Sequence, residues 1–76
     1  MEINEFVQNF AAQFDETDAE LFSMETKFRD IEEWSSFTAL SLIAMVDEDY
    51  NVKLKGDDIR NSKTIQEIFN IVKSRM

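Results

Sequence analysis

The chain contains no cysteine, no histidine and no proline, and it has one glycine among its 76 residues. Without cysteine it has no disulfide, no cysteine-ligated zinc site and no thiol nucleophile. Without histidine it lacks the side chain that most often acts as a general base or binds a transition metal near neutral pH. Chemistry at neutral pH would need a borrowed group, so we expect neither a metal site nor an enzyme.

Positive charge is scarce as well. The 16 acidic residues stand against 8 Lys and Arg, which gives a formal net charge of −8. This excess disfavours nucleic acid and anionic membranes as partners and favours basic protein surfaces. No apolar run approaches the roughly 20 residues of a transmembrane helix, and Met1–Asn4 lacks the basic and apolar regions of a signal peptide. We expect a cytoplasmic monomer that does not insert into membranes.

The residues that are present favour helices. Helical spacing of apolar side chains predicts a first amphipathic helix at about residues 2–14. A polar connection then extends from Asp15 to about Trp34, with a short helical turn near residues 18–22, where Thr17 and Glu20 have the spacing of a capping box. Apolar anchors should hold this connection to the core: Leu21, Phe22, Phe28, Ile31 and Trp34.

A second helix is predicted from about Ser36 to Tyr50, apolar around most of its circumference. A short third helix at residues 56–60 and a last helix from Ile65 follow, the latter preceded by a Thr64–Glu67 capping box. The fold class is therefore all-α: one domain, residues 1–76, built as a small four-helix bundle with three main helices, one short helix and a long first loop. The expected core includes the phenylalanines Phe6, Phe10, Phe14, Phe22, Phe28 and Phe69.

Four features around the second helix carry a family resemblance. They are Ser36 at its start, the acidic–aromatic end Asp47–Tyr50, Phe28 followed by Asp30 ahead of it, and Ser62–Gln66 before the last helix. In these features, which align without gaps from Phe28 to Gln66, the chain resembles the acyl carrier protein family over nearly its full length. That family has its serine inside an Asp-Ser-Leu motif, whereas here Ser35 and Phe37 take the flanking places and Glu33 replaces a common glycine.

The resemblance implies a fold of acyl-carrier type and a function. A phosphopantetheinyl transferase would attach 4′-phosphopantetheine from coenzyme A to Ser36, and the arm would carry acyl or related intermediates as thioesters. The departures at Ser35 and Phe37 favour a carrier dedicated to one fatty-acyl, lipid or secondary-metabolite pathway. An anion at Ser36 is physically reasonable, because a helix N-terminus favours negative charge by about 0.3–1 kcal/mol at an exposed site.

Six acidic residues and no basic one lie between Asp30 and Asp49. Three precede Ser36 and three end its helix: Asp30, Glu32 and Glu33, then Asp47, Glu48 and Asp49. A charged surface of this kind suits fast, weak docking to the transferase and to acyl-transferring or synthase enzymes with basic surfaces. The predicted docking residues are Phe37, Leu40, Ser41 and Met45 at an apolar centre, with Asp47 and Glu48 beside them.

Two alternatives weigh against these assignments. Ser36 would have only a structural role if it were the N-cap of the second helix, in an unmodified acidic interaction module of the same fold; we expect Ser35 to be the cap. Asp47, Asp49 and Asn51 also have the spacing of the first ligands of a calcium loop. Val52 and Asp58 stand where that loop needs glycine and glutamate, which disfavours a dedicated calcium site.

Overall fold

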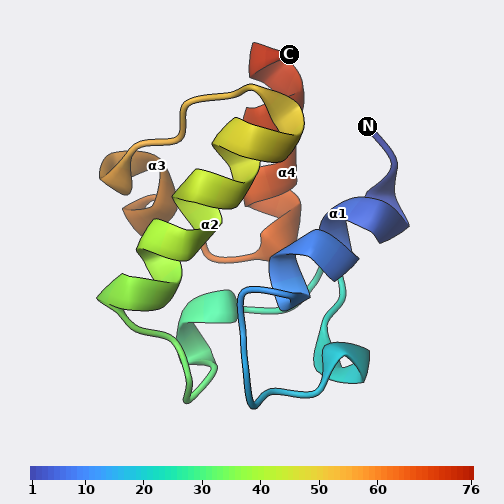
Figure 1. Ribbon diagram of the computed structural model, residues 1–76, viewed down its shortest axis with the longest axis vertical. Coiled ribbons are helices and arrows are strands. Elements are labelled where there is room, and N and C mark those ends of the chain that lie inside the picture. The colour runs from blue at the N-terminus through green and yellow to red at the C-terminus, as the bar shows by residue number, and fades with distance from the viewer.

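The computed structural model describes residues 1–76 and is entirely helical. The four helices are α1 (Ile3–Ala11), α2 (Ser36–Tyr50), α3 (Gly56–Arg60) and α4 (Ile65–Arg75). Two 3₁₀ turns, Ala19–Leu21 and Phe28–Asp30, interrupt the first connection. In Figure 1, α2 and α4 run in the same general direction, α1 crosses beside α4, and the short α3 lies at the opposite side.

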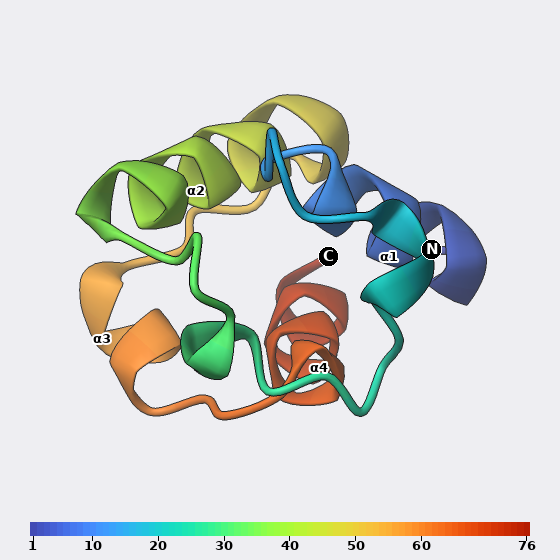
Figure 2. The ribbon, with the colours of Figure 1, turned by 90° about the horizontal axis from the view of Figure 1, so that it is seen from below.

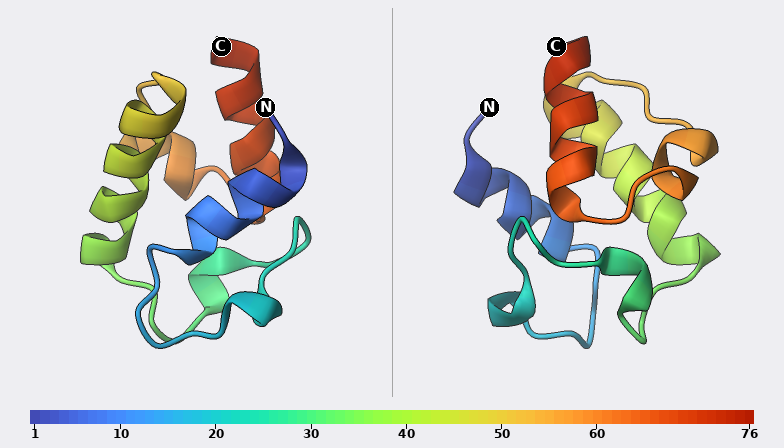
Figure 3. Two further views of the ribbon diagram at one scale, coloured as in Figure 1. Left: turned by 45° about the vertical axis from the view of Figure 1, so that its right-hand side comes forward. Right: turned by 180° about the vertical axis from the view of Figure 1, so that it is seen from behind.

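The predicted all-α class and small helical bundle are confirmed, and the predicted bounds of α2 and α3 agree with the structure. Helix α1 is shorter than expected because it ends at Ala11, after which Gln13 and Phe14 form tighter turns onto Phe10 and Ala11. Both chain ends lie toward the same end of the bundle (Figure 3). None of the helices combines the length and hydropathy that crossing a bilayer requires.

Aromatic side chains join the first connection to the helices. Phe6 and Phe10 of α1 are fully buried, and the ring of Phe6 lies 5.4 Å from that of Phe69 in α4. Phe10 packs edge-on against Phe28, whose ring centre is 5.5 Å away. All six phenylalanines predicted as core are buried. Since aromatic pairs add about 0.5–1.5 kcal/mol beyond their burial, these contacts hold a long loop that has little regular structure.

The prediction for one anchor of the first connection was wrong. Leu21 is 70% exposed, because the 3₁₀ turn directs its neighbour Phe22 into the core instead. The predicted Thr17–Glu20 capping box is also absent. Asp18 caps the turn by accepting a hydrogen bond from the amide of Glu20, at 3.0 Å.

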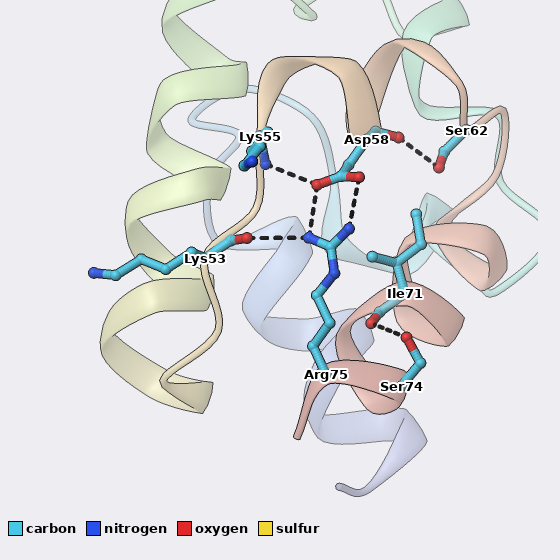
Figure 4. A network of polar contacts seen from close by, with 7 residues as sticks. All are labelled: Lys53, Lys55, Asp58, Ser62, Ile71, Ser74 and Arg75. Atoms are coloured by element: carbon cyan, nitrogen blue, oxygen red, sulfur yellow. Dashed lines mark hydrogen bonds and ion pairs between the residues drawn. The ribbon is translucent and has the colours of Figure 1, made fainter.

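Polar contacts connect α3 to the end of α4 (Figure 4). Asp58 accepts two hydrogen bonds from the Arg75 guanidinium, at 2.8 and 2.9 Å, and one from the amide of Lys55 at 2.9 Å. Arg75 also donates to the carbonyl of Lys53. The hydrogen bond to Arg75 lowers the pKa of Asp58, and the Lys55 amide acts in the same direction. At its other end α4 has the predicted Thr64–Glu67 capping box.

Candidate functional site

The start of α2 is capped by Ser35, as the sequence predicts. Its backbone is extended, with φ of −155°, and its Oγ accepts a hydrogen bond from the amide of Thr38 at 3.3 Å. The Thr38 hydroxyl donates to the carbonyl of Glu33, which ties the preceding loop to the first turn. The alternative in which Ser36 serves as the N-cap is therefore wrong, because the capping oxygen belongs to the residue before it.

Ser36 is the first residue of α2 and is exposed. Its hydroxyl makes no hydrogen bond with the rest of the protein, and the amides of Ser36 and Phe37 donate none. Open amides of this kind at the start of a 15-residue helix favour an anion. The arrangement leaves an exposed hydroxyl, with no neighbouring acid or base within hydrogen-bonding distance to activate it.

A groove of about 430 Å³ opens beside Ser36, between the first half of α2 and α3. Half of its lining residues are apolar, and it has two basic side chains, one from the 3₁₀ turn Phe28–Asp30 and one from α3. The lining residues are Arg29, Trp34, Ser35, Ser36, Ala39, Leu40, Ile43, Gly56, Ile59 and Arg60. The sequence pattern gives no sign of this groove, because its walls come from separate segments of the chain.

The predicted apolar docking residues separate into two groups. Phe37 is 75% exposed and Leu40 is 65% exposed, while Ser41 is half-buried. Met45, in contrast, is 7% exposed and packs in the core. Its assignment to the docking surface is therefore corrected: Met45 follows Leu42 by three residues, which places both on the face of α2 that covers the core.

The acidic residues also divide by position. Glu48 is exposed at the end of α2, and Asp47 forms an ion pair with Lys53 at 2.8 Å. Asp30 and Glu32, ahead of α2, are exposed and make no ion pair. These side chains remain on the surface on either side of Ser36, so the acidic character of this surface rests on them.

Glu33 has a structural role that the sequence does not reveal. One carboxylate oxygen accepts hydrogen bonds from the Thr17 hydroxyl at 2.7 Å and from the amides of Glu16 and Thr17. The other oxygen accepts from the amide of Asp15 at 2.5 Å. The Thr17 hydroxyl, followed by the backbone amides, lowers the pKa of Glu33 against the opposing effect of desolvation. Glu33 thus holds the first connection and is removed from the set of docking acids.

The loop after α2 is used for packing. Asn51 ends the helix in the left-handed conformation, with φ of 56°, which asparagine tolerates better than most residues. Val52 and Leu54 are buried, and Lys53 engages Asp47, the first residue of the calcium-loop spacing. The structure groups no three Asp or Glu side chains in positions that would hold a metal ion.

Comparisons of the chain with protein-family models, with curated proteins and with solved structures find no match.

Proposed function

We propose that the protein is an acyl carrier that holds acyl or related intermediates as thioesters on a 4′-phosphopantetheine arm attached to Ser36. The observation that supports this most directly is the exposed, unbonded hydroxyl of Ser36 at the start of α2. Because Ser35 caps the helix, Ser36 has no structural task there. The fold, three main helices with one short helix and a long first loop, agrees with the proposal.

The attachment step requires little of the chain itself. The Ser36 oxygen forms a bond to the phosphorus of the pantetheine phosphate, the phosphoanhydride bond of coenzyme A breaks, and adenosine 3′,5′-bisphosphate leaves. The hydroxyl proton passes to a base on the transferase, since this chain has no histidine or cysteine. The arm, once attached, supplies the thiol on which cargo is carried. The open amides at residues 36 and 37 stabilise the new negative charge.

The surface around Ser36 suits transient docking. Phe37 and Leu40 form an exposed apolar centre, with Asp47 and Glu48 further along the same helix. Oppositely charged partner surfaces accelerate association and leave affinity modest. The double variant Asp47→Lys with Glu48→Lys should slow loading by a transferase about tenfold or more at low salt. Glu20→Lys with Glu25→Lys, which changes net charge equally in the first connection, should leave the rate much closer to wild type.

Intact-mass measurement tests the proposal. The purified chain is incubated with coenzyme A, Mg²⁺ and a broad-specificity phosphopantetheinyl transferase. The wild type should gain one phosphopantetheine and Ser36→Ala none. Ser74→Ala, a control at an exposed serine of α4 outside the docking surface, should gain the same as the wild type. Absence of a gain with several transferases, on protein that circular dichroism shows to be folded, contradicts the proposal. A gain in Ser36→Ala contradicts the assignment of the site.

A second candidate function is an unmodified interaction module, for which the exposure of Phe37 and Leu40 is the favouring observation. Apolar side chains this exposed on one helix face often mark a protein contact. In that case Ser36→Ala keeps full affinity for the partner, whereas Phe37→Ala and Leu40→Ala weaken it. A carrier would instead lose its covalent cargo completely with Ser36→Ala, whereas the two apolar substitutions would only slow its loading.

A further inference from the structure

Three basic side chains line one hollow of about 390 Å³. The hollow is lined by Lys27, Arg29 and Lys63, together with Asp30, and by no apolar residue. These three cations are a large share of the 8 basic residues in a chain that has 16 acidic ones. The charge of this cluster is therefore opposite in sign to the net charge of the protein.

None of the three cations forms an ion pair in the protein, although the carboxylate of Glu67 interacts electrostatically with Lys63. The ion pairs are Lys53 with Asp47, Arg60 with Asp57, and Arg75 with Asp58. Two acids lie near the hollow. Asp30 lines it without pairing with any of the cations, and Glu67 directs its carboxylate to the amides of Lys63 and Thr64, at 2.7 and 3.1 Å.

Backbone hydrogen bonds and a buried phenylalanine fix the position of the backbone that carries these cations. The amide of Ile65 donates to the carbonyl of Thr26 at 3.1 Å, and the amide of Gln66 donates to the carbonyl of Met24 at 2.9 Å. Figures 2 and 3 show this part of the first connection passing beside the start of α4. Phe28, between Lys27 and Arg29, is fully buried. The like charges are thus held near one another, and a bound anion would relieve their repulsion.

We propose that Lys27, Arg29 and Lys63 form a binding site for a multivalent oxyanion of the phosphate or polycarboxylate class. The guanidinium offers a planar pair of donors and the two ammonium groups add point charges, a combination suited to such oxyanions. The absence of apolar residues from the lining disfavours a hydrophobic ligand. Arg29 also lines the groove beside Ser36, so the anion is either free in solution or the charged end of a group attached at Ser36.

Titration of the unmodified full-length chain with inorganic phosphate, at constant ionic strength held with NaCl, tests the site. Amide NMR signals of residues 27–30 and 63–64 should shift and saturate. Arg29→Gln and Lys63→Gln should each weaken phosphate binding about tenfold or more. Lys73→Gln removes the same charge from an exposed lysine on α4 that has no ion pair and lies outside the hollow, and should leave binding unchanged. The proposal is overturned if the shifts fail to saturate, or if Lys73→Gln weakens phosphate binding as much as Arg29→Gln and Lys63→Gln do. Either result indicates an adventitious ion only.

A second series distinguishes the two sources of the anion and rests on the proposed attachment at Ser36. Protein carrying an arm with an uncharged acyl group is compared with protein carrying a carboxylate-ended acyl group. Loss of phosphate binding in the carboxylate-ended form alone supports the site and identifies the cargo as its anion. Equal phosphate binding in both forms supports a site for a free anion. Because the phosphate titration uses the unmodified chain, a failure of loading at Ser36 leaves its result unaffected.

Discussion

Two faces of α2 carry apolar residues, yet they relate to the core in opposite ways. At the start, Phe37 and Leu40 are mostly exposed, whereas further along Leu42, Met45 and Val46 are buried. A step of two residues along a helix rotates the side-chain direction by about 200°, so Leu40 and Leu42 point to nearly opposite sides. The face of α2 that carries Leu42, Met45 and Val46 therefore serves the fold, while the face that carries Phe37 and Leu40 stays exposed.

The pair Leu42→Ala and Leu40→Ala tests this comparison with the largest expected effect. Leu42 is 1% exposed and Leu40 is 65% exposed. Truncating the buried leucine should lower the free energy of unfolding by about 2–5 kcal/mol, because it leaves a cavity. The exposed leucine should change it by less than about 0.5 kcal/mol. Urea unfolding followed by circular dichroism measures both.

The stability of so small a domain is only about 3–5 kcal/mol, so Leu42→Ala is expected to be partly unfolded in water. Leu42→Met conserves volume and should cost less than about 1.5 kcal/mol, which keeps the measurement within range. Equal losses for Leu40→Ala and Leu42→Ala would contradict the difference between the two faces of α2.

A smaller effect distinguishes the two serines at the start of the helix. Ser35→Ala removes the cap and should lower the free energy of unfolding by about 1 kcal/mol. Ser36→Ala should change it by less than about 0.5 kcal/mol, since this hydroxyl has no hydrogen bond to lose. Thermal and urea unfolding of the two variants provide the measurement. The reverse ranking would assign the capping role to Ser36 and weaken the case for its modification.

The smallest effect concerns acid stability. The folded-state pKa of Glu33 is lowered by the Thr17 hydroxyl and the backbone amides. Its hydrogen bonds therefore stabilise the protein above the ordinary glutamate pKa of about 4.3, and this stabilisation is lost as pH falls through the lower folded-state value. Glu33→Gln should flatten the dependence of stability on pH between about pH 5 and pH 3.

Glu32→Gln is the matched control, because the neighbouring exposed acid accepts no hydrogen bond from the first connection. It should retain the acid dependence of the wild type. Asp58 and Glu67, whose pKa values are also lowered, keep part of that dependence in both variants. If Glu33→Gln and Glu32→Gln have identical pH profiles, the carboxylate of Glu33 does not hold the loop in solution.

Local sequence signals were sufficient where neighbouring residues decide the outcome. The largely apolar segment from Phe37 to Val46 predicted α2, and the Thr64–Glu67 spacing predicted the start of α4. The assignment of the cap to Ser35 was also confirmed. In contrast, Thr17 and Glu20 have equally good capping spacing, but the Thr17 hydroxyl is bound by Glu33, 16 residues away. A local rule fails when a distant group competes for the same atom.

The candidate site was predictable in part. The sequence indicated Ser36 and the exposed Phe37 and Leu40, but it placed Met45 on the wrong face of α2. That helix is apolar nearly all round, so its sequence does not show which face meets the core. Packing against α1 and α4, which fills the interior with Phe6, Phe10 and Phe69, makes that choice.

By itself, the sequence determined that this chain is helical, acidic and without a histidine or cysteine for catalysis, because these follow from composition and short-range spacing. Only the tertiary structure decided that Glu33 holds the first connection, that a groove opens beside Ser36, and that Lys27, Arg29 and Lys63 share one hollow. Each of these features joins segments distant along the chain, so it exists only after the core has brought those segments together.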